Sequence, residues 1–142
     1  ESYFLQAEAI LRFPTETGLS DADAQTFYEM GIEASFQKLG TPSTPALYGV
    51  GGPYEWTGSV ANKRELIAVQ KWVSMVDSQG LEAYLEQLRT GYPDFFEESV
   101  NSVLNPGEFP RRLLFPSLER DRNSENVPEL EPITESVWWD VN

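Results

Sequence analysis

The sequence predicts a mainly α-helical protein, built of helical hairpins that are followed by an irregular, loop-rich C-terminal region. Three observations predict this class. Apolar residues recur at spacings of three, four and seven within four segments that precede Tyr92. Capping patterns and Gly–Pro breaks separate those segments. After Tyr92 the periodicity fades, and prolines interrupt the chain too often for long helices, at Pro93, Pro106, Pro110, Pro116, Pro128 and Pro132.

The first predicted hairpin spans residues 2–40. Its first helix, over residues 2–12, carries an apolar face made of Tyr3, Phe4, Ala7, Ile10 and Leu11. Ser20 with Asp23 is typical of the N-cap of a second helix, and Gly40 is the expected residue after its C-terminus. The apolar stripe of this second helix consists of Tyr28, Ile32, Phe36 and Leu39. A short connection between the helices predicts antiparallel packing.

The second predicted hairpin spans residues 60–90. Asn62 with Glu65 fits a capping box at its start. The apolar seam of the first helix is expected to consist of Leu66, Val69, Val73 and Val76. After a break at residues 77–80, a shorter stripe follows in Leu81, Tyr84, Leu85 and Leu88. Trp72 lies beside the predicted seam and is interpreted as a core residue.

The remaining residues, 92–142, are expected to form an irregular tail. Ser117 is predicted to cap one short helix in it. The tail ends with the apolar pair Trp138 and Trp139, and exposed tandem tryptophans would favour aggregation. We therefore expect the tail to dock on the helical hairpins, so that residues 1–142 make one domain or a fragment of one.

Charge and composition exclude several classes of function. The chain has 23 acidic and 10 basic residues, with a formal net charge of -13. Such a field repels phosphate backbones and anionic lipid surfaces, so nucleic acid is not an expected partner, whereas neutral sugars and peptides remain open. No window approaches the roughly 18 consecutive apolar residues of a membrane-spanning helix.

The residue types also restrict the possible chemistry. The chain contains no histidine and no cysteine, which removes the usual general base, nucleophilic thiol and zinc ligands. We therefore expect no catalytic residue, no metal ligand and no cofactor. Two alternatives stay open: a glycosidase that uses two carboxylates, and a calcium site unlike an EF-hand. Loops that begin at Asp21 and Asp121 resemble EF-hand starts but lack the required glycine and glutamate.

The loop between the hairpins contains the best candidates for ligand contacts, Tyr48, Tyr54 and Trp56. Aromatic faces in such a loop can stack on sugar rings. The alternative is that Tyr54 and Trp56 fold inward and pin a glycine-rich loop to the helices. Arg111 and Arg112 lie in a proline-bounded segment and are interpreted as internal ion-pair partners rather than as an anion site.

Seven short motifs occur in the same order, and with similar gaps, as in the C-terminal part of SusD/RagB proteins. They are Tyr3–Ala9 (YFLQAEA), Phe27–Phe36 (FYEMGIEASF), Gln70–Val73 (QKWV), Gly80–Tyr84 (GLEAY), Leu88–Pro93 (LRTGYP), Pro110–Glu119 (PRRLLFPSLE) with Asn123 and Asn126, and Val137–Asp140 (VWWD). Together they cover essentially the whole chain, which resembles roughly the last third of such a protein.

The resemblance implies a non-catalytic, surface-exposed lipoprotein of the outer membrane of a Bacteroidetes-type bacterium, with tetratricopeptide-like hairpins. Such a protein captures oligosaccharides or peptides for a SusC-like TonB-dependent transporter, and its lipid anchor would lie outside this chain. The family's glycan-contacting aromatics lie mostly upstream, so no ligand contact is carried over. A helical-repeat scaffold that binds other proteins is the main alternative.

Overall fold

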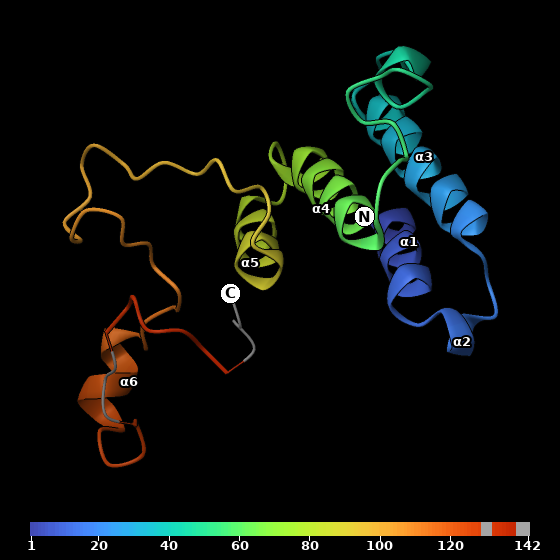
Figure 1. The fold of residues 1–142 in the computed structure, drawn as a ribbon. Helices are drawn as coiled ribbons and strands as arrows, with labels where there is room; N and C mark the ends of the chain where they lie inside the picture. Colours follow the sequence, from blue (N-terminus) through green and yellow to red (C-terminus); the bar gives the residue numbers. More distant parts are fainter. Residues whose placement is uncertain (129–131, 139–142) are drawn as a thin grey trace. The chain divides into compact units, whose positions relative to one another are not determined.

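The computed structural model describes residues 1–128 and 132–138, and the chain divides into two compact units, Glu1–Asp94 and Phe95–Asn142. The described residues contain helices and no strand, and the helices of the first unit pack in pairs (Figure 1). This confirms the predicted fold class.

The first unit consists of two helical hairpins and the loop between them. Its elements are α1 (Ser2–Arg12), α2 (Pro14–Thr17), α3 (Asp21–Lys38), the 3-10 turn η1 (Pro45–Leu47), α4 (Val60–Met75) and α5 (Gly80–Thr90). Helix α1 packs on α3, α4 packs on α5, and α4 also contacts α1 and α3. The predicted break after α1 contains one extra helical turn, α2, whose first residue is Pro14. Proline is tolerated there because the first helical N–H needs no intrahelical partner.

Helix α3 begins as the sequence predicts, and of its predicted stripe Tyr28 and Ile32 are buried, whereas Leu39 is 61% exposed. Ser20 caps it, since its hydroxyl accepts a hydrogen bond from the Asp23 N–H while the Asp23 carboxylate accepts one from the Ser20 N–H at 2.8 Å. A Cβ atom added at Gly31 would lie 2.7 Å from the ring of Phe4 on α1. The absence of a side chain at this position therefore permits the close approach of α1 and α3.

The predicted cap of α4 is wrong by three residues. The N-cap is Ser59, whose hydroxyl accepts a hydrogen bond from the Asn62 N–H, and the Asn62 side chain accepts one from the Ser59 N–H at 3.0 Å. Asn62 therefore occupies the third helical position, and Glu65 has no part in the cap. The amide oxygen of Asn62 replaces the glutamate or glutamine of the usual capping box.

The predicted seam of α4 is also displaced. The buried residues of α4 are Ile67, Ala68, Lys71 and Met75. Val73 and Val76 are 51% and 50% exposed, and Trp72 is half-buried. The physical reason is that α4 packs against three helices, and its buried face includes a lysine. The whole Lys71 side chain is buried, and its ammonium group lies 3.1 Å from Glu86 Oε2 on α5.

One continuous core joins the first hairpin, α4 and the loop. Its buried members are Phe4, Ala7, Ile10, Ala24, Tyr28, Ile32, Tyr48, Trp56 and Ile67. Tyr28 connects the helices to the loop, since its ring lies 5.1 Å from that of Trp56 and its hydroxyl donates a 3.0 Å hydrogen bond to the Tyr54 carbonyl. Burial raises the pKa of the Tyr28 hydroxyl well above its usual range, so it remains a donor.

The second unit contains one short helix, α6 (Ser117–Arg122), among its described residues. Its N-cap is Pro116 and Ser117 is the first helical residue, so the predicted cap is wrong by one position. The Arg112 guanidinium donates hydrogen bonds to the Glu135 and Ser136 carbonyls at 3.0 and 3.1 Å. The ion pairs expected of the two arginines and the docking of the tail stay predictions.

Trp139 and Asp140, the end of the VWWD motif, lie outside the described residues.

Candidate functional site

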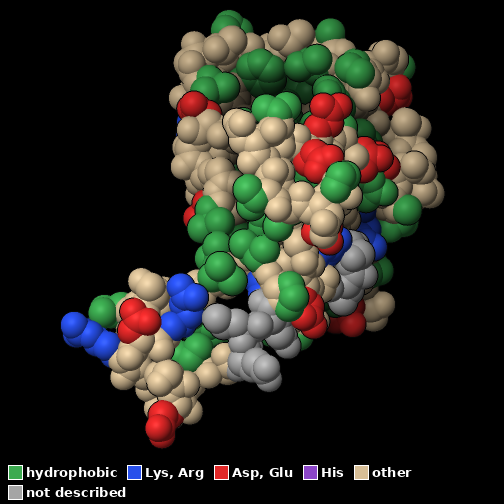
Figure 2. Space-filling model, turned by 90° about the vertical axis from the view of Figure 1, so that its left-hand side faces the viewer, with side chains coloured by type: hydrophobic (Ala, Val, Ile, Leu, Met, Phe, Trp, Pro, Cys, Tyr) green, Lys and Arg blue, Asp and Glu red, His purple; other side chains and the backbone are tan. Residues whose placement is uncertain are grey.

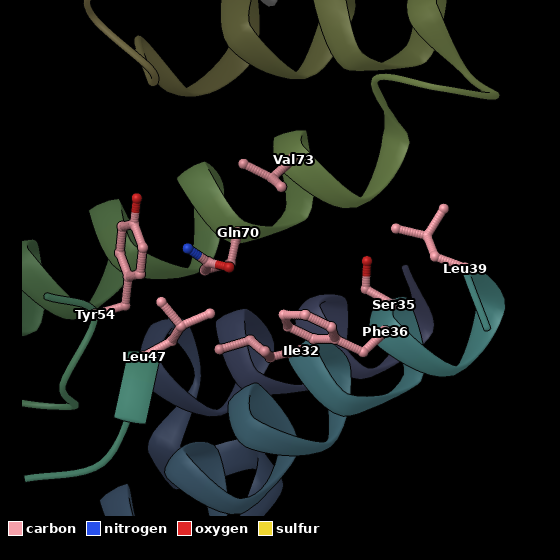
Figure 3. A pocket seen from close by; sticks show the side chains of 8 residues that line it. All are labelled: Ile32, Ser35, Phe36, Leu39, Leu47, Tyr54, Gln70 and Val73. Carbon is pink, nitrogen blue, oxygen red and sulfur yellow. The ribbon is translucent and has the colours of Figure 1, made fainter. Parts of the chain in front are cut away.

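A pocket of about 160 Å³ lies between α3, the inter-hairpin loop and α4, and we call it the α3–α4 pocket (Figure 3). It is lined by Ile32, Ser35, Phe36, Leu39, Leu47, Tyr54, Gln70 and Val73. The spacing of three and four along each helix places the lining residues of α3 and of α4 on one face each. The pocket is therefore formed by one stripe of residues on each helix, and the loop forms one of its ends.

The apolar part of the pocket comes from α3 and the loop. Ile32 is buried, while Phe36 and Leu47 are partly buried and pack against the core. Leu39 is 61% exposed and lies at the C-terminal end of α3. Val73, which was predicted to lie in the buried seam of α4, lines the pocket instead.

Three polar side chains complete the lining: the Ser35 hydroxyl, the Gln70 amide and the Tyr54 phenol. In Figure 3 the Gln70 amide extends toward the end of the pocket that Tyr54 forms, and the Ser35 hydroxyl rises from α3 toward α4. In the described part of the chain none of these three side chains has a hydrogen-bond partner. Their donors and acceptors are thus available to a ligand, and no charged side chain lines this pocket.

The three aromatic residues predicted to contact a ligand lie in different environments. Tyr48 is 7% exposed and donates a 2.8 Å hydrogen bond to Glu33. Trp56 is 8% exposed, and its ring is covered by Tyr28 and by the Lys63 ammonium group, 5.4 Å from the ring centroid. Both therefore hold the loop against the helices. Only Tyr54 lines the pocket.

Ser35 and Gln70 were not singled out by the sequence analysis. A weak signal was present, because each is a polar residue next to an apolar helical stripe. That signal has no specificity, since polar residues flank every amphipathic helix. Only the packing of α3 beside α4 brings the two residues to one pocket.

A second, more open pocket of about 440 Å³ lies along the loop and the start of α4. Its lining is Gly52, Pro53, Glu55, Thr57, Gly58, Asn62, Glu65 and Leu66. Asn62 is already used in the cap of α4, and the Glu55 carboxylate accepts a 2.8 Å hydrogen bond from the Gly51 N–H. Several of its polar groups thus hold the local fold, and it is the weaker candidate.

The carboxylates of the first loop considered for calcium, Asp21 and Asp23, are engaged in other contacts. A hydrogen bond from Lys63 and a second from Trp56 lower the pKa of Asp21, and the Lys63 ammonium group lies 2.8 Å from both of its oxygens. Asp23 serves in the cap of α3. Within residues 1–128 and 132–138 no group of three or more acidic side chains is placed to hold a metal ion.

Comparison with known families decides the identity. The profile of a SusD-like family, described as "Starch-binding associating with outer membrane", matches residues 1–116. The chain belongs to the SusD-like family. Its members are non-catalytic binding proteins that associate with the outer membrane, and the match confirms the resemblance drawn from the motifs. No curated protein and no solved structure matches this SusD-like chain.

None of the helices described for this SusD-like chain combines the length and apolar character required to cross a bilayer.

Proposed function

We propose that this chain takes part in capturing neutral oligosaccharides at the outer-membrane surface, for delivery to a SusC-like TonB-dependent transporter. The observation that carries the proposal is the family match over residues 1–116. In this proposal a lipid anchor holds the protein at the surface. Peptides are the second ligand class that the family resemblance admits.

Charge supports the choice of neutral ligands. The chain has a formal net charge of -13, and Figure 2 shows acidic side chains distributed over one face. Sulfated or uronic-acid-rich glycans would be repelled by this field, whereas neutral glycans would not. The α3–α4 pocket adds uncharged hydrogen-bonding groups beside an aromatic ring, which suits a sugar.

The three aromatic residues of the loop have distinct parts in this proposal. Tyr54 contacts the ligand from the end of the pocket. Tyr48 and Trp56 act indirectly, because their buried contacts with Glu33 and Tyr28 fix the loop that carries Tyr54. Rigid support of this kind reduces the entropy lost when a ligand binds.

Calorimetric titration of the full chain with maltoheptaose tests the proposal, with an oligogalacturonate of similar length as the charged counterpart. We expect saturable binding of maltoheptaose that changes little between about 0.05 and 0.5 M salt, because no charge pair is involved. Absence of binding to maltoheptaose and to other neutral glycans would contradict the proposal. Release of shorter sugars would instead support the carboxylate-dependent glycosidase.

A protein-binding scaffold is the second candidate. Leu39 and Val73 are more than half exposed at the rim of the pocket, and Val76, half exposed, is the C-cap of α4. Apolar side chains at a rim favour contact with another protein. Binding of an apolar peptide, together with no binding of any glycan, would favour the scaffold.

A further inference from the structure

We infer that the α3–α4 pocket is a subsite for one uncharged pyranose ring, in which Gln70 and Ser35 hydrogen-bond to the sugar hydroxyls. The inference rests on the proposed function and specifies where part of the glycan binds. It assigns a ligand-contacting role to Gln70 and Ser35, two helical residues that the sequence pattern did not single out.

The size of the pocket suits one ring. Its volume is about 160 Å³. A protein cavity of about 150 Å³ accommodates one benzene molecule. The six-membered frame of one sugar ring is similar in size to benzene and fits the pocket, while its hydroxyls extend toward the polar groups and the open side. Neighbouring rings of an oligosaccharide would lie outside, over the exposed rim at Leu39 and Val73.

The distribution of polar and apolar groups matches the two kinds of surface on a pyranose. Phe36, Leu47 and the Tyr54 ring offer apolar surface to the C–H groups of a sugar ring. The Gln70 amide offers both donors and an acceptor, which suits hydroxyls that also donate and accept. Ser35 adds a second donor and acceptor on the facing helix.

A purely apolar ligand fits this lining less well. The Ser35, Gln70 and Tyr54 side chains have no hydrogen-bond partner in the described chain, so they exchange hydrogen bonds with water when the pocket is empty. An apolar group would displace that water without replacing its hydrogen bonds. A sugar hydroxyl replaces them.

The lining also discriminates against charged sugars. It contains no Lys or Arg that could pair with a carboxylate or sulfate. An anionic substituent would lose hydration without gaining a counter-charge. The expected ligand unit is therefore a neutral pyranose rather than a uronic acid or sulfated sugar.

The test uses the full 142-residue chain and three variants: Gln70→Leu and Ser35→Ala in the pocket, and Gln37→Leu as the matched control. Gln37 is an exposed residue of α3 that does not line the pocket, so the same chemical change is made there outside the proposed subsite. Binding of maltoheptaose is measured by calorimetry, and thermal unfolding verifies that each variant is folded. Methyl α-glucoside serves as a one-ring probe, followed by backbone and side-chain amide NMR shifts.

We expect Gln70→Leu and Ser35→Ala each to weaken maltoheptaose binding roughly 3- to 10-fold, the effect of losing one hydrogen bond. Gln37→Leu should bind as the unchanged chain does. Methyl α-glucoside should shift the Gln70 side-chain amide signal, and the methyl glycoside of glucuronic acid should not.

Three results would overturn the inference in distinguishable ways. If the unchanged chain binds maltoheptaose but both folded pocket variants bind it equally well, the subsite is wrong and the proposed function stands. If the unchanged chain binds no neutral glycan, the proposed function fails and the subsite fails with it. If an apolar peptide shifts the Gln70 signal and no sugar does, the pocket binds protein side chains.

Discussion

Arg89 links the two hairpins of the first unit through a partly buried group of charges. Its guanidinium contacts both oxygens of Glu8 on α1, at 3.0 and 2.7 Å, and Glu86 on its own helix at 2.6 Å. Glu8 also contacts Arg12 at 2.7 Å. A two-point arginine–carboxylate contact of this kind is both directional and strong, so it connects α5 to α1 through their side chains.

Glu8 should therefore stabilise the fold in a pH-dependent manner. Burial alone would raise its pKa, but hydrogen bonds and charges from Arg89 and Arg12 outweigh burial and lower the pKa from its ordinary value of 4.5. Because the folded pKa is the lower one, the stabilisation is fully present above about pH 4.5 and is lost as the pH falls through the folded pKa.

Replacing Glu8 with glutamine should cost about 1.5–3 kcal/mol of unfolding free energy near pH 7, the usual effect of hydrogen bonds to charged groups. The difference from the unchanged chain should narrow steadily in acid. Urea unfolding at several pH values measures both effects, with Glu16→Gln on the exposed face of α2 as the control. An equal loss of unfolding free energy at neutral and acid pH would show that the packing of the Glu8 side chain, rather than its charge, stabilises the fold.

At the scale of the helix, the start of α4 depends on the N-cap Ser59, which the sequence pattern did not identify. Ser59 and Asn62 satisfy each other's backbone N–H groups. The pair Asn62 and Glu65 matches the familiar pattern better, because its third residue is a glutamate. Geometry rather than pattern decides which serine or asparagine becomes the cap.

Two substitutions separate these possibilities. Ser59→Ala should reduce the unfolding free energy by about 1 kcal/mol, because the Asn62 N–H loses its acceptor. Glu65→Ala should change it by less than about 0.5 kcal/mol. Chemical denaturation measures both variants. A greater loss of unfolding free energy for Glu65→Ala than for Ser59→Ala would indicate that Asn62 is the cap.

At the scale of the molecule, the first unit contains a complete core. Every member of the main apolar cluster lies within Glu1–Asp94, and so do the charges around Arg89. A unit of this length is large enough to bury a core without disulfides or metals. We therefore expect the first unit to fold independently.

A chain ending after Asp94 should therefore be helical and unfold in one cooperative transition. Circular dichroism during thermal and urea unfolding tests this, with the full chain measured under the same conditions. A broad, non-cooperative transition would contradict it. The same comparison tests the predicted docking of the tail, which requires the full chain to have the higher unfolding free energy; equal values would count against docking.

The sequence by itself determined the helical class, the bounds of α1, the cap of α3 at Ser20 and the family. The first three features follow from signals within a few residues of one another, a periodic stripe and a capping box, whereas the family follows from short motifs in a fixed order along the chain. The stripe and the capping box depend on the backbone geometry of a single helix, which neighbouring segments change little.

Only the tertiary structure decided which face of α4 is buried and where a ligand could bind. Lys71 is buried because Glu86 lies beside it on the next helix. A search for apolar periodicity treats a lysine as exposed, so it could not predict this buried position. Likewise, Ser35 and Gln70 become parts of one pocket because α3 packs beside α4, and Tyr54 joins them because Trp56 and Tyr48 hold its loop. These arrangements arise from contacts between residues far apart in the chain. They are stabilised by the burial of apolar surface and by the pairing of polar groups at those contacts.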